Sequence, residues 1–397
     1  MTISGVGTNP AIQPIMLQKH PAYRTQINLL RTAFPERVAT TKPPDTFEHE
    51  RWRSDGFVQK LRRYVSRLDD LTLRKTEIAY ISGSFRPHMH RFLKSVRSAY
   101  LDIDDPLCLY SDGTRNSLKG TELRGVAINL MNRLDAGHLS FWSNAQLGNF
   151  LANFYADETV EFLATDRLSV LPPAIVPQAD ASSIGMFETL RCLAIASGKF
   201  WHKGVPDAIA AVDRLVGDGV PISLTIVGAD IPKDWLAFIH SRPYLELQTK
   251  LSRADLNDVM QRHDVLVFPS HHDTYGWVLL EAKSFGLPSV TTDFYNRSEI
   301  VSNRIDGLLV QDPFGNPFLP IGPASYAAAH LSISQGHIQV GRLLEKYIDD
   351  LAQALRGLAA DRAFLQRLGV AALESVQPES KFGVATRIAR LSPYLAA

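Results

Sequence analysis

Cysteine is almost absent from this chain of 397 residues, which holds only Cys108 and Cys192. Two cysteines exclude a disulfide-stapled scaffold and are typical of a protein in a reducing compartment. No uncharged apolar run approaches the roughly 18 residues that a membrane-spanning helix needs. The first residues, MTISGVGTNPAIQP, lack the basic and apolar pattern of a signal peptide. We therefore expect a cytoplasmic protein.

Net charge is also nearly absent, since 42 Lys and Arg oppose 41 Asp and Glu. This balance gives no global attraction to polyanions, so we expect no nucleic-acid partner. No GxGxxG motif follows a predicted strand, which disfavours a nicotinamide-dependent dehydrogenase. Hydrophobic and charged contents of 45% and 21% are those of a globular protein. The length fits two domains of about 150 to 200 residues.

Apolar strands alternate with amphipathic helices in the C-terminal half. Such alternation predicts a parallel sheet that is covered on both faces and binds ligands at the carboxyl ends of its strands. The N-terminal half shows the same alternation more faintly, with a helix predicted at residues 90–99 and strands at 77–82 and 106–111. Strands of the C-terminal half are predicted at residues 189–197, 222–228, 245–250, 265–270 and 289–293.

The most informative segment runs from Phe268 to Pro288 and is predicted to form a buried strand, a loop and a helix. The loop carries Asp273, the first helical turn holds Gly276, and Glu281 follows in the helix. A helix start offers backbone N–H groups and a positive dipole end, which suit a phosphate or diphosphate. A carboxylate on either side of such a seat matches the hexose, diphosphate and ribose of a nucleotide sugar.

This segment resembles the sugar-nucleotide motif of family 4 glycosyltransferases, in which two acids flank a turn of glycine and small residues. The likeness covers roughly residues 186–310 and takes in SGKFWHKG, ADLNDVMQRHDVLVF, Glu299 and Gly307. Asp273 stands where the family usually has Glu. The resemblance implies an α/β GT-B fold, with two Rossmann-like domains facing across a cleft and a C-terminal helix that returns to the N-terminal domain.

A proline-rich stretch at residues 172–177, followed by polar residues, predicts a linker, so we place the domain boundary near residues 174–186. The resemblance then implies an N-terminal acceptor domain over residues 1–178 and a C-terminal nucleotide-sugar donor domain over residues 186–377. Residues 378–397 are expected to form the helix that packs back on the N-terminal domain.

The resemblance also assigns roles in the donor domain. Lys199 and Lys203 lie where the family has an Arg and a Lys that neutralise the leaving diphosphate, although they are four residues apart rather than five or six. Glu281 is assigned to the ribose hydroxyls, and Asp273 to the donor sugar or, as a competing interpretation, to a cap on the following helix. Further donor contacts, mostly through backbone N–H groups, are expected from Ser270, Thr274, Tyr275, Gly276, Trp277 and Val278.

The N-terminal half lacks the glycine-rich turn that the family places after its first strand, and QKHPAYR stands there instead. Lys19, His20 or Arg24 are therefore the alternatives for contacting phosphate by side chain. The small-residue turn Ser82-Gly83 is a candidate for admitting the acceptor. His88, His90 and Asp112 are weaker candidates for groups that face the cleft.

Two further sequence features are interpreted as ordinary structure rather than as functional sites. Asp102-Ile103-Asp104-Asp105 has the look of a DxD metal motif, but nothing downstream continues that pattern, and we interpret it as a loop. We therefore expect no metal ion and no cofactor beyond the nucleotide sugar, which is a co-substrate. Residues 51–75 contain eight Lys or Arg, which favours a solvated helix face over a membrane-surface helix that brings the enzyme to a lipid-linked acceptor.

Taken together, the sequence predicts a glycosyltransferase of polysaccharide or glycan biosynthesis. It would move a hexose from a nucleoside-diphosphate sugar to the hydroxyl of a saccharide, glycan or lipid-linked acceptor, with retention of anomeric configuration. The alternatives are a nucleotide-sugar epimerase or hydrolase of GT-B fold and a non-catalytic scaffold that binds nucleotide sugars.

Overall fold

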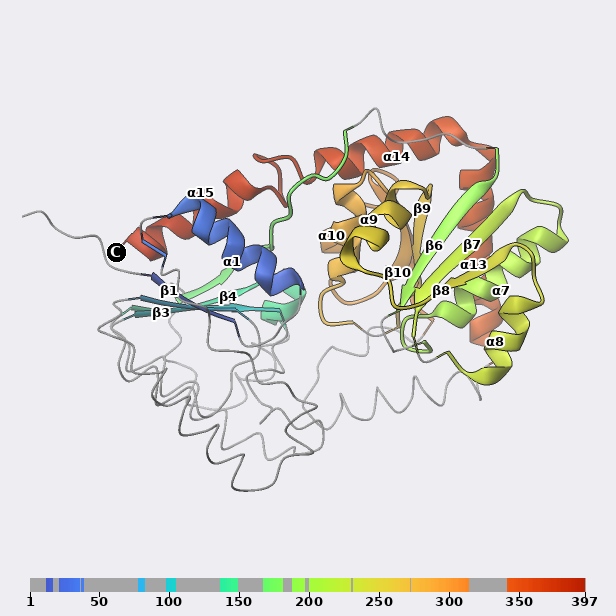
Figure 1. The fold of residues 1–397 in the computed structure, drawn as a ribbon, viewed down its shortest axis with the longest axis horizontal. Coiled ribbons are helices and arrows are strands. Elements are labelled where there is room, and N and C mark those ends of the chain that lie inside the picture. Colours follow the sequence, from blue (N-terminus) through green and yellow to red (C-terminus); the bar gives the residue numbers. More distant parts are fainter. Residues whose placement is uncertain are drawn as a thin grey trace, which may run out of the picture. The chain divides into compact units, whose positions relative to one another are not determined.

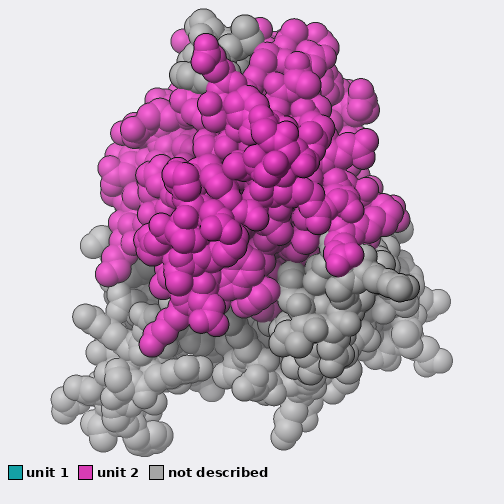
Figure 2. Space-filling model, turned by 90° about the vertical axis from the view of Figure 1, so that its right-hand side faces the viewer, with its two compact units in different colours: residues 1–174, 385–397 teal, residues 175–384 magenta. Residues whose placement is uncertain are grey.

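The computed structural model describes twelve segments of the chain, drawn in colour in Figure 1. They are residues 12–16, 21–35, 37–38, 78–82, 98–104, 136–148, 167–180, 188–196, 200–229, 231–271, 273–313 and 341–396. The chain divides into unit 1, residues 1–174 with 385–397, and unit 2, residues 175–384, which is magenta in Figure 2. The sequence places the boundary in the same stretch of chain, near residues 174–186.

Unit 2 is built on a parallel sheet whose described strands follow the order β11-β10-β9-β6-β7-β8. Both faces of this sheet are covered, so β9 is buried at all four of its positions, in keeping with its uniformly apolar sequence VLVF. The strands are β6 (Leu190–Ala196), β7 (Ile222–Gly228), β8 (Leu245–Gln248), β9 (Val265–Phe268), β10 (Ser289–Asp293) and β11 (Gly307–Gln311).

Helices alternate with these strands and complete the core of unit 2. Side chains of α7 and α13, among them Val212 and Leu351, are buried in one cluster with Leu224 and Val265 of the sheet. The helices are α7 (Val205–Gly217), α8 (Lys233–His240), α9 (Arg253–Gln261), α10 (Trp277–Ser284), α11 (Arg297–Ile300), α13 (Gly341–Ala360) and α14 (Arg362–Glu374). The alternation predicted for this half is confirmed.

Unit 1 contains a second parallel sheet, whose described strands follow the order β1-β2-β3-β4-β5. They are β1 (Ile12–Met16), β2 (Ile78–Ser82), β3 (Ser98–Ile103), β4 (Ala136–Phe141) and β5 (Leu168–Val170), and α1 (Pro21–Ala33) follows β1. The helix predicted at residues 90–99 is wrong at its end, because Ser98 and Ala99 begin β3 and pair with Ile78 and Ala79. The strand predicted at residues 106–111 lies outside the described residues.

The last helix, α15 (Val384–Ala396), belongs to unit 1 although it follows unit 2 in the chain. It lies beside α1 over the sheet (Figure 1), and its Leu391 and Leu395 are buried with Ile27 and Tyr80 in the core. Its apolar face thus completes a core that the N-terminal residues alone leave open.

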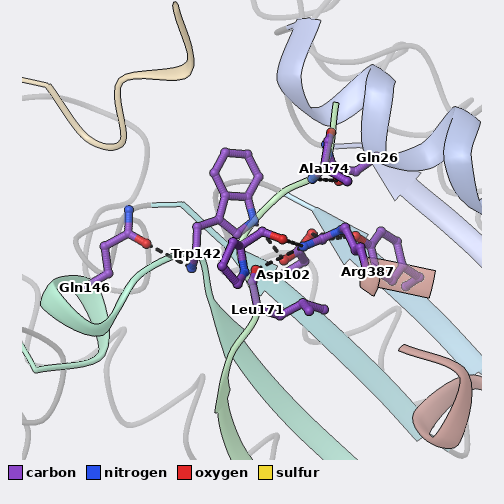
Figure 3. Close-up of polar contacts among 9 residues, drawn as sticks. Gln26, Asp102, Trp142, Gln146, Leu171, Ala174 and Arg387 are labelled. Carbon is purple, nitrogen blue, oxygen red and sulfur yellow. Dashed lines mark hydrogen bonds and ion pairs between the residues drawn. The ribbon is translucent and has the colours of Figure 1, made fainter. Parts of the chain in front are cut away.

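A buried ion pair fixes α15 to the sheet (Figure 3). Nη2 of Arg387 pairs with Oδ2 of Asp102, which also accepts the Tyr80 hydroxyl at 2.5 Å. The indole N–H of Trp142 donates to Oδ1 of Asp102 at 2.8 Å. Burial alone lowers the pKa of Arg387, but the Asp102 carboxylate outweighs it, and the pKa lies above its ordinary value. The Arg387 guanidinium is therefore held in its charged form inside the unit.

The same contacts correct the interpretation of the acidic triplet as a loop. Asp102 lies in β3 and is fully buried, and its two oxygens are taken by Arg387, Tyr80 and Trp142. Such a carboxylate is a structural partner of the C-terminal helix. A metal-binding DxD motif needs carboxylate oxygens that an ion can reach. Asp102 is buried, and both of its oxygens already have protein partners.

Candidate functional site

The switch in strand order of unit 2 lies between β6 and β9. From β6 the chain moves outward through β7 and β8, and then returns to the other side of β6 to form β9. Loops that leave two neighbouring strands in opposite directions open a crevice at the carboxyl ends, where parallel α/β sheets bind ligands. The Lys203 segment follows β6 and the Asp273 segment follows β9, so the topology brings these two predicted segments together.

Close backbone contacts join the two loops. Both the backbone N–H of His271, at 2.9 Å, and the hydroxyl of Ser270, at 3.2 Å, donate to the carbonyl of His202. Gly204 has a φ of +65°, and a Cβ added there would lie 2.0 Å from the carbonyl oxygen of Pro269. Only glycine fits this conformation and this approach, so the residue after Lys203 is fixed by the loop that carries Asp273.

Replacing Gly204 by alanine is expected to lower the free energy of unfolding of unit 2 by about 1–3 kcal/mol, since it adds left-handed strain to a backbone clash. The matched control is Gly217→Ala at the end of α7, where no atom lies within 4 Å of an added Cβ. That change should leave stability equal or slightly higher. Urea denaturation followed by fluorescence measures both variants. Equal midpoints for wild type and Gly204→Ala would contradict the tight approach of the two loops.

An ion pair lies at the junction of these loops. Nζ of Lys203 pairs with Oδ2 of Asp273, and both side chains are largely buried, at 13% and 15% exposure. Oδ1 of Asp273 accepts the backbone N–H groups of Tyr275, at 3.3 Å, and Gly276, at 3.1 Å. Asp273 therefore has the capping contacts that the sequence left as a competing interpretation, and its role toward a sugar stays a prediction.

The turn that leads into α10 ends at Gly276, the N-cap residue, whose φ is +89°. Asp273 takes the N–H groups of Tyr275 and Gly276, and the N–H of Leu279 donates to the carbonyl of Gly276 at 2.8 Å. Trp277 and Tyr275 are buried, whereas Thr274 and Val278 are partly exposed. A phosphate seat at this helix start stays a prediction.

Glu281 lies one turn into α10 and is held from two sides. Its Oε1 accepts the indole N–H of Trp277 at 3.0 Å and Nη1 of Arg253 at 2.5 Å. Among the described residues, none donates to its Oε2. Burial raises the pKa of the Glu281 carboxyl, and the Arg253 guanidinium opposes that rise. One oxygen is thereby anchored, and the role of the other toward a ribose stays a prediction.

The other predicted site residues belong to unit 1 or lie outside the described residues. Arg24 is exposed on α1, and Ser82 ends β2 in unit 1. Several candidates, together with the basic segment 51–75, lie outside the described residues: Lys19, Lys199, His20, Gly83, His88, His90 and Asp112.

The sequence missed three polar side chains beneath the site. Nε2 of His271 lies 2.8 Å from Oδ2 of Asp207, and both residues are buried. Arg297 is fully buried and contacts the carbonyl of Tyr275. The signal for Trp277 as a partner of Glu281 was present, since the two are four residues apart on one helix. No comparable local signal marks Arg297 or Asp207, because their partners are distant in sequence.

The family model for Glycosyl transferases group 1 matches residues 191–315, which include every residue of the cluster described above. The chain contains a glycosyl transferases group 1 domain. The resemblance found in the sequence is confirmed at the level of this family. Its narrower assignment to family 4 stays a prediction.

Two relatives share parts of this domain. Glycogen synthase of Mycobacterium tuberculosis (strain ATCC 25618 / H37Rv) is 35% identical over 113 residues, or 27% of this chain and 27% of that protein. Lipopolysaccharide glucosyltransferase WaaG of Escherichia coli (strain K12) is 27% identical over 171 residues, or 38% of this chain and 44% of that protein. The chain thus matches less than half the length of either relative.

Solved structures resemble the chain over nearly its whole length. HepE of Anabaena in complex with UDP has a TM-score of 0.62 at 15% identity. The match covers 97% of this chain and 99% of the HepE chain. WaaG has a TM-score of 0.57 at 15% identity, and the match covers 96% of this chain and 98% of the WaaG chain. Likeness at these identities concerns the fold alone, and it confirms the α/β GT-B class predicted from the sequence.

Two searches of the described residues found no candidates. No described helix is long and apolar enough to cross a membrane. Within the same segments, no group of three or more His, Cys, Asp or Glu side chains could hold a metal ion.

Proposed function

We propose that this protein is a glycosyltransferase that moves a hexose from a nucleoside-diphosphate sugar to an acceptor hydroxyl. The observation that carries the proposal is the cluster at the strand-order switch of the group 1 domain. There the Lys203–Asp273 pair lies at the start of α10, and Glu281 presents a free carboxylate oxygen one turn into that helix. A cation, a helix start and an anchored acid suit the three parts of such a donor.

Each group has a proposed task. Lys203 stabilises the negative charge that develops on the leaving diphosphate, and Lys199 assists it. Oε2 of Glu281 accepts the ribose hydroxyls, and amides in the first turn of α10 bind phosphate. Asp273 holds the donor sugar and stabilises positive charge at the anomeric carbon. Residues 186–377 bind the donor in this scheme, and residues 1–178 bind the acceptor.

The finer features of the proposal follow the family resemblance. Transfer retains anomeric configuration and uses no metal ion, and the leaving phosphate oxygen accepts the proton of the acceptor hydroxyl. The acceptor is a saccharide, glycan or lipid-linked sugar, and the enzyme is cytoplasmic.

The proposal is tested by identifying the nucleotide first. Thermal-shift measurements with UDP, GDP, ADP and dTDP should show a rise in Tm with one of them, because a ligand that binds only the folded state stabilises it. The matching nucleotide sugars are then assayed with and without acceptors. Transfer to an acceptor supports the proposal. Free sugar released without acceptor indicates a hydrolase or epimerase, and binding without any turnover indicates a scaffold.

Replacing Glu281 by alanine is expected to raise the Kd of that nucleoside diphosphate by about 10- to 100-fold, because two charge-assisted hydrogen bonds to ribose are lost. Isothermal titration calorimetry measures the change. The control is Glu374→Ala, which removes an exposed acid at the end of α14. Unchanged affinity in the Glu281 variant would remove the ribose assignment.

A further inference from the structure

Arg297, the first residue of α11, is a buried cation that makes no ion pair with any described carboxylate. Its side chain has 0% exposure. Nη1 donates to the carbonyl of Tyr275 and to Oδ1 of Asn296, both at 2.7 Å. Within the described part of the chain, no carboxylate oxygen lies within ion-pair distance of this guanidinium. Buried arginines in folded proteins normally have an anionic partner.

The unused donors of Arg297 share one edge of the guanidinium. Both Nε and Nη2 are buried, and neither has a hydrogen-bond partner among the residues that the structure describes. In a planar guanidinium these two N–H groups point in parallel, and this fork matches two oxygens of a phosphate or carboxylate. Nη1 thus bonds to protein oxygens, while the Nε–H and Nη2–H groups on the opposite edge have the geometry to bind an oxyanion.

The guanidinium as a whole lies close to the candidate donor site. The Arg297 guanidinium lies 5.5 Å from the ring centroid of Phe268, and Nζ of Lys203 lies 5.3 Å from the same centroid. A Cβ added to Gly276 would lie 2.9 Å from Nη1, so the guanidinium packs directly against the turn before α10. Lys203 and Arg297 together outnumber the single carboxylate of Asp273, which leaves one positive charge beside the turn.

We propose that Arg297 is a further phosphate-binding residue, whose Nε and Nη2 take two oxygens of the donor diphosphate beside Lys203. The proposal rests on the proposed function, since it assumes a nucleotide-sugar donor at this turn. Gly276 is glycine, in this view, because any side chain would push the guanidinium out of reach.

Access to the enclosed edge requires the turn from Asp273 to Gly276 to move. Lys203 holds that turn through Asp273, and an arriving diphosphate competes with Asp273 for the same ammonium group. Loosening the pair also loosens the turn, whose Tyr275 carbonyl holds Nη1, so that the guanidinium can turn its free edge toward the diphosphate. Binding of the diphosphate and exposure of the second cation are thereby coupled.

The test compares Arg297→Lys with wild type in binding inorganic pyrophosphate, UDP and uridine by calorimetry. Lysine keeps the charge and loses the fork, so pyrophosphate and UDP should bind about 10- to 100-fold more weakly, while uridine binding stays unchanged. The control is Arg304→Lys at an arginine that packs over Phe364, away from the turn. It should leave all three affinities unchanged.

The outcomes separate this inference from the proposed function. Equal pyrophosphate and UDP affinities in wild type and Arg297→Lys overturn the inference, even if the enzyme transfers hexose. An equal loss for uridine and UDP also overturns it, because that pattern means that Arg297 only supports the turn. Wild-type protein that binds neither pyrophosphate nor UDP overturns it as well. Fork-dependent pyrophosphate binding without hexose transfer leaves the inference standing and removes the proposed function.

A measurement on wild-type protein covers the case in which Arg297→Lys does not fold. Arginine Nε–H groups give NMR signals, and the enclosed Nε–H of Arg297 should exchange slowly with solvent. Titration with pyrophosphate should shift a slowly exchanging signal of this kind. If every protected arginine signal stays in place while pyrophosphate binds, the inference is wrong.

Discussion

Replacing Lys203 by methionine is expected to lower the kcat of hexose transfer by about 10²- to 10³-fold, with a smaller change in KM. The leaving diphosphate gains charge in the transition state, and Lys203 is positioned for it by the loop contact at Gly204 and by Asp273. Methionine keeps most of the apolar stem of the side chain and lacks the ammonium group that lies over Phe268. Steady-state kinetics with the identified donor measure the effect.

The matched control for this change is Lys233→Met, at an exposed lysine that begins α8. It should leave kcat unchanged. Asp273→Asn separates the two tasks of the ion pair, because it removes the partner of Lys203 and keeps an oxygen for the turn amides. If Lys203→Met retains wild-type kcat, the cation has no part in the chemical step.

The largest effect on stability is expected from Arg387→Leu, which should lower the free energy of unfolding of unit 1 by about 3–5 kcal/mol. The change leaves Asp102 buried and charged, with only Tyr80 and Trp142 as donors. It also frees the carbonyls of Leu171 and Pro172, which accept from Nη1 at 3.0 and 2.7 Å. Chemical denaturation measures the loss.

Arg390→Leu is the control for this variant, since Arg390 is exposed on the same helix and donates only to the carbonyl of Val170. A change within about 0.5 kcal/mol is expected there. The double variant Asp102→Leu with Arg387→Leu should recover much of the loss, because it leaves no charge buried alone. Equal stability of the two single arginine variants would mean that the buried pair contributes nothing.

The sheet of unit 2 was predictable because its signals are local. Strands such as β9 are buried on both faces, so their sequences are continuous apolar runs. In contrast, β3 carries a charged residue in the core, and its sequence SAYLDI follows a run that has helical spacing. Asp102 tolerates burial only because Arg387 meets it from 285 positions along the chain. No window of neighbouring residues contains that information.

The candidate site likewise has a part that the sequence predicts and a part that it does not. The spacing of Asp273, Gly276 and Glu281 encodes a loop, a helix start and one helical turn, and the sequence therefore predicts their order. One oxygen of Asp273 contacts Lys203 and the other accepts from the turn. This arrangement depends on two loops that are 70 residues apart in the sequence. The environment of Arg297 is assembled from Phe268, Tyr275 and Asn296, and its importance is visible only in three dimensions.

The place of α15 in unit 1 bears on how the protein is made. A chain that emerges from the ribosome in order completes all of unit 2 before the residues that finish unit 1 appear. Until then the β3 carboxylate has no cation to meet it, and the apolar surface around Tyr80 stays uncovered. The first half of the protein to be synthesised can therefore complete its core only after the last residues have emerged.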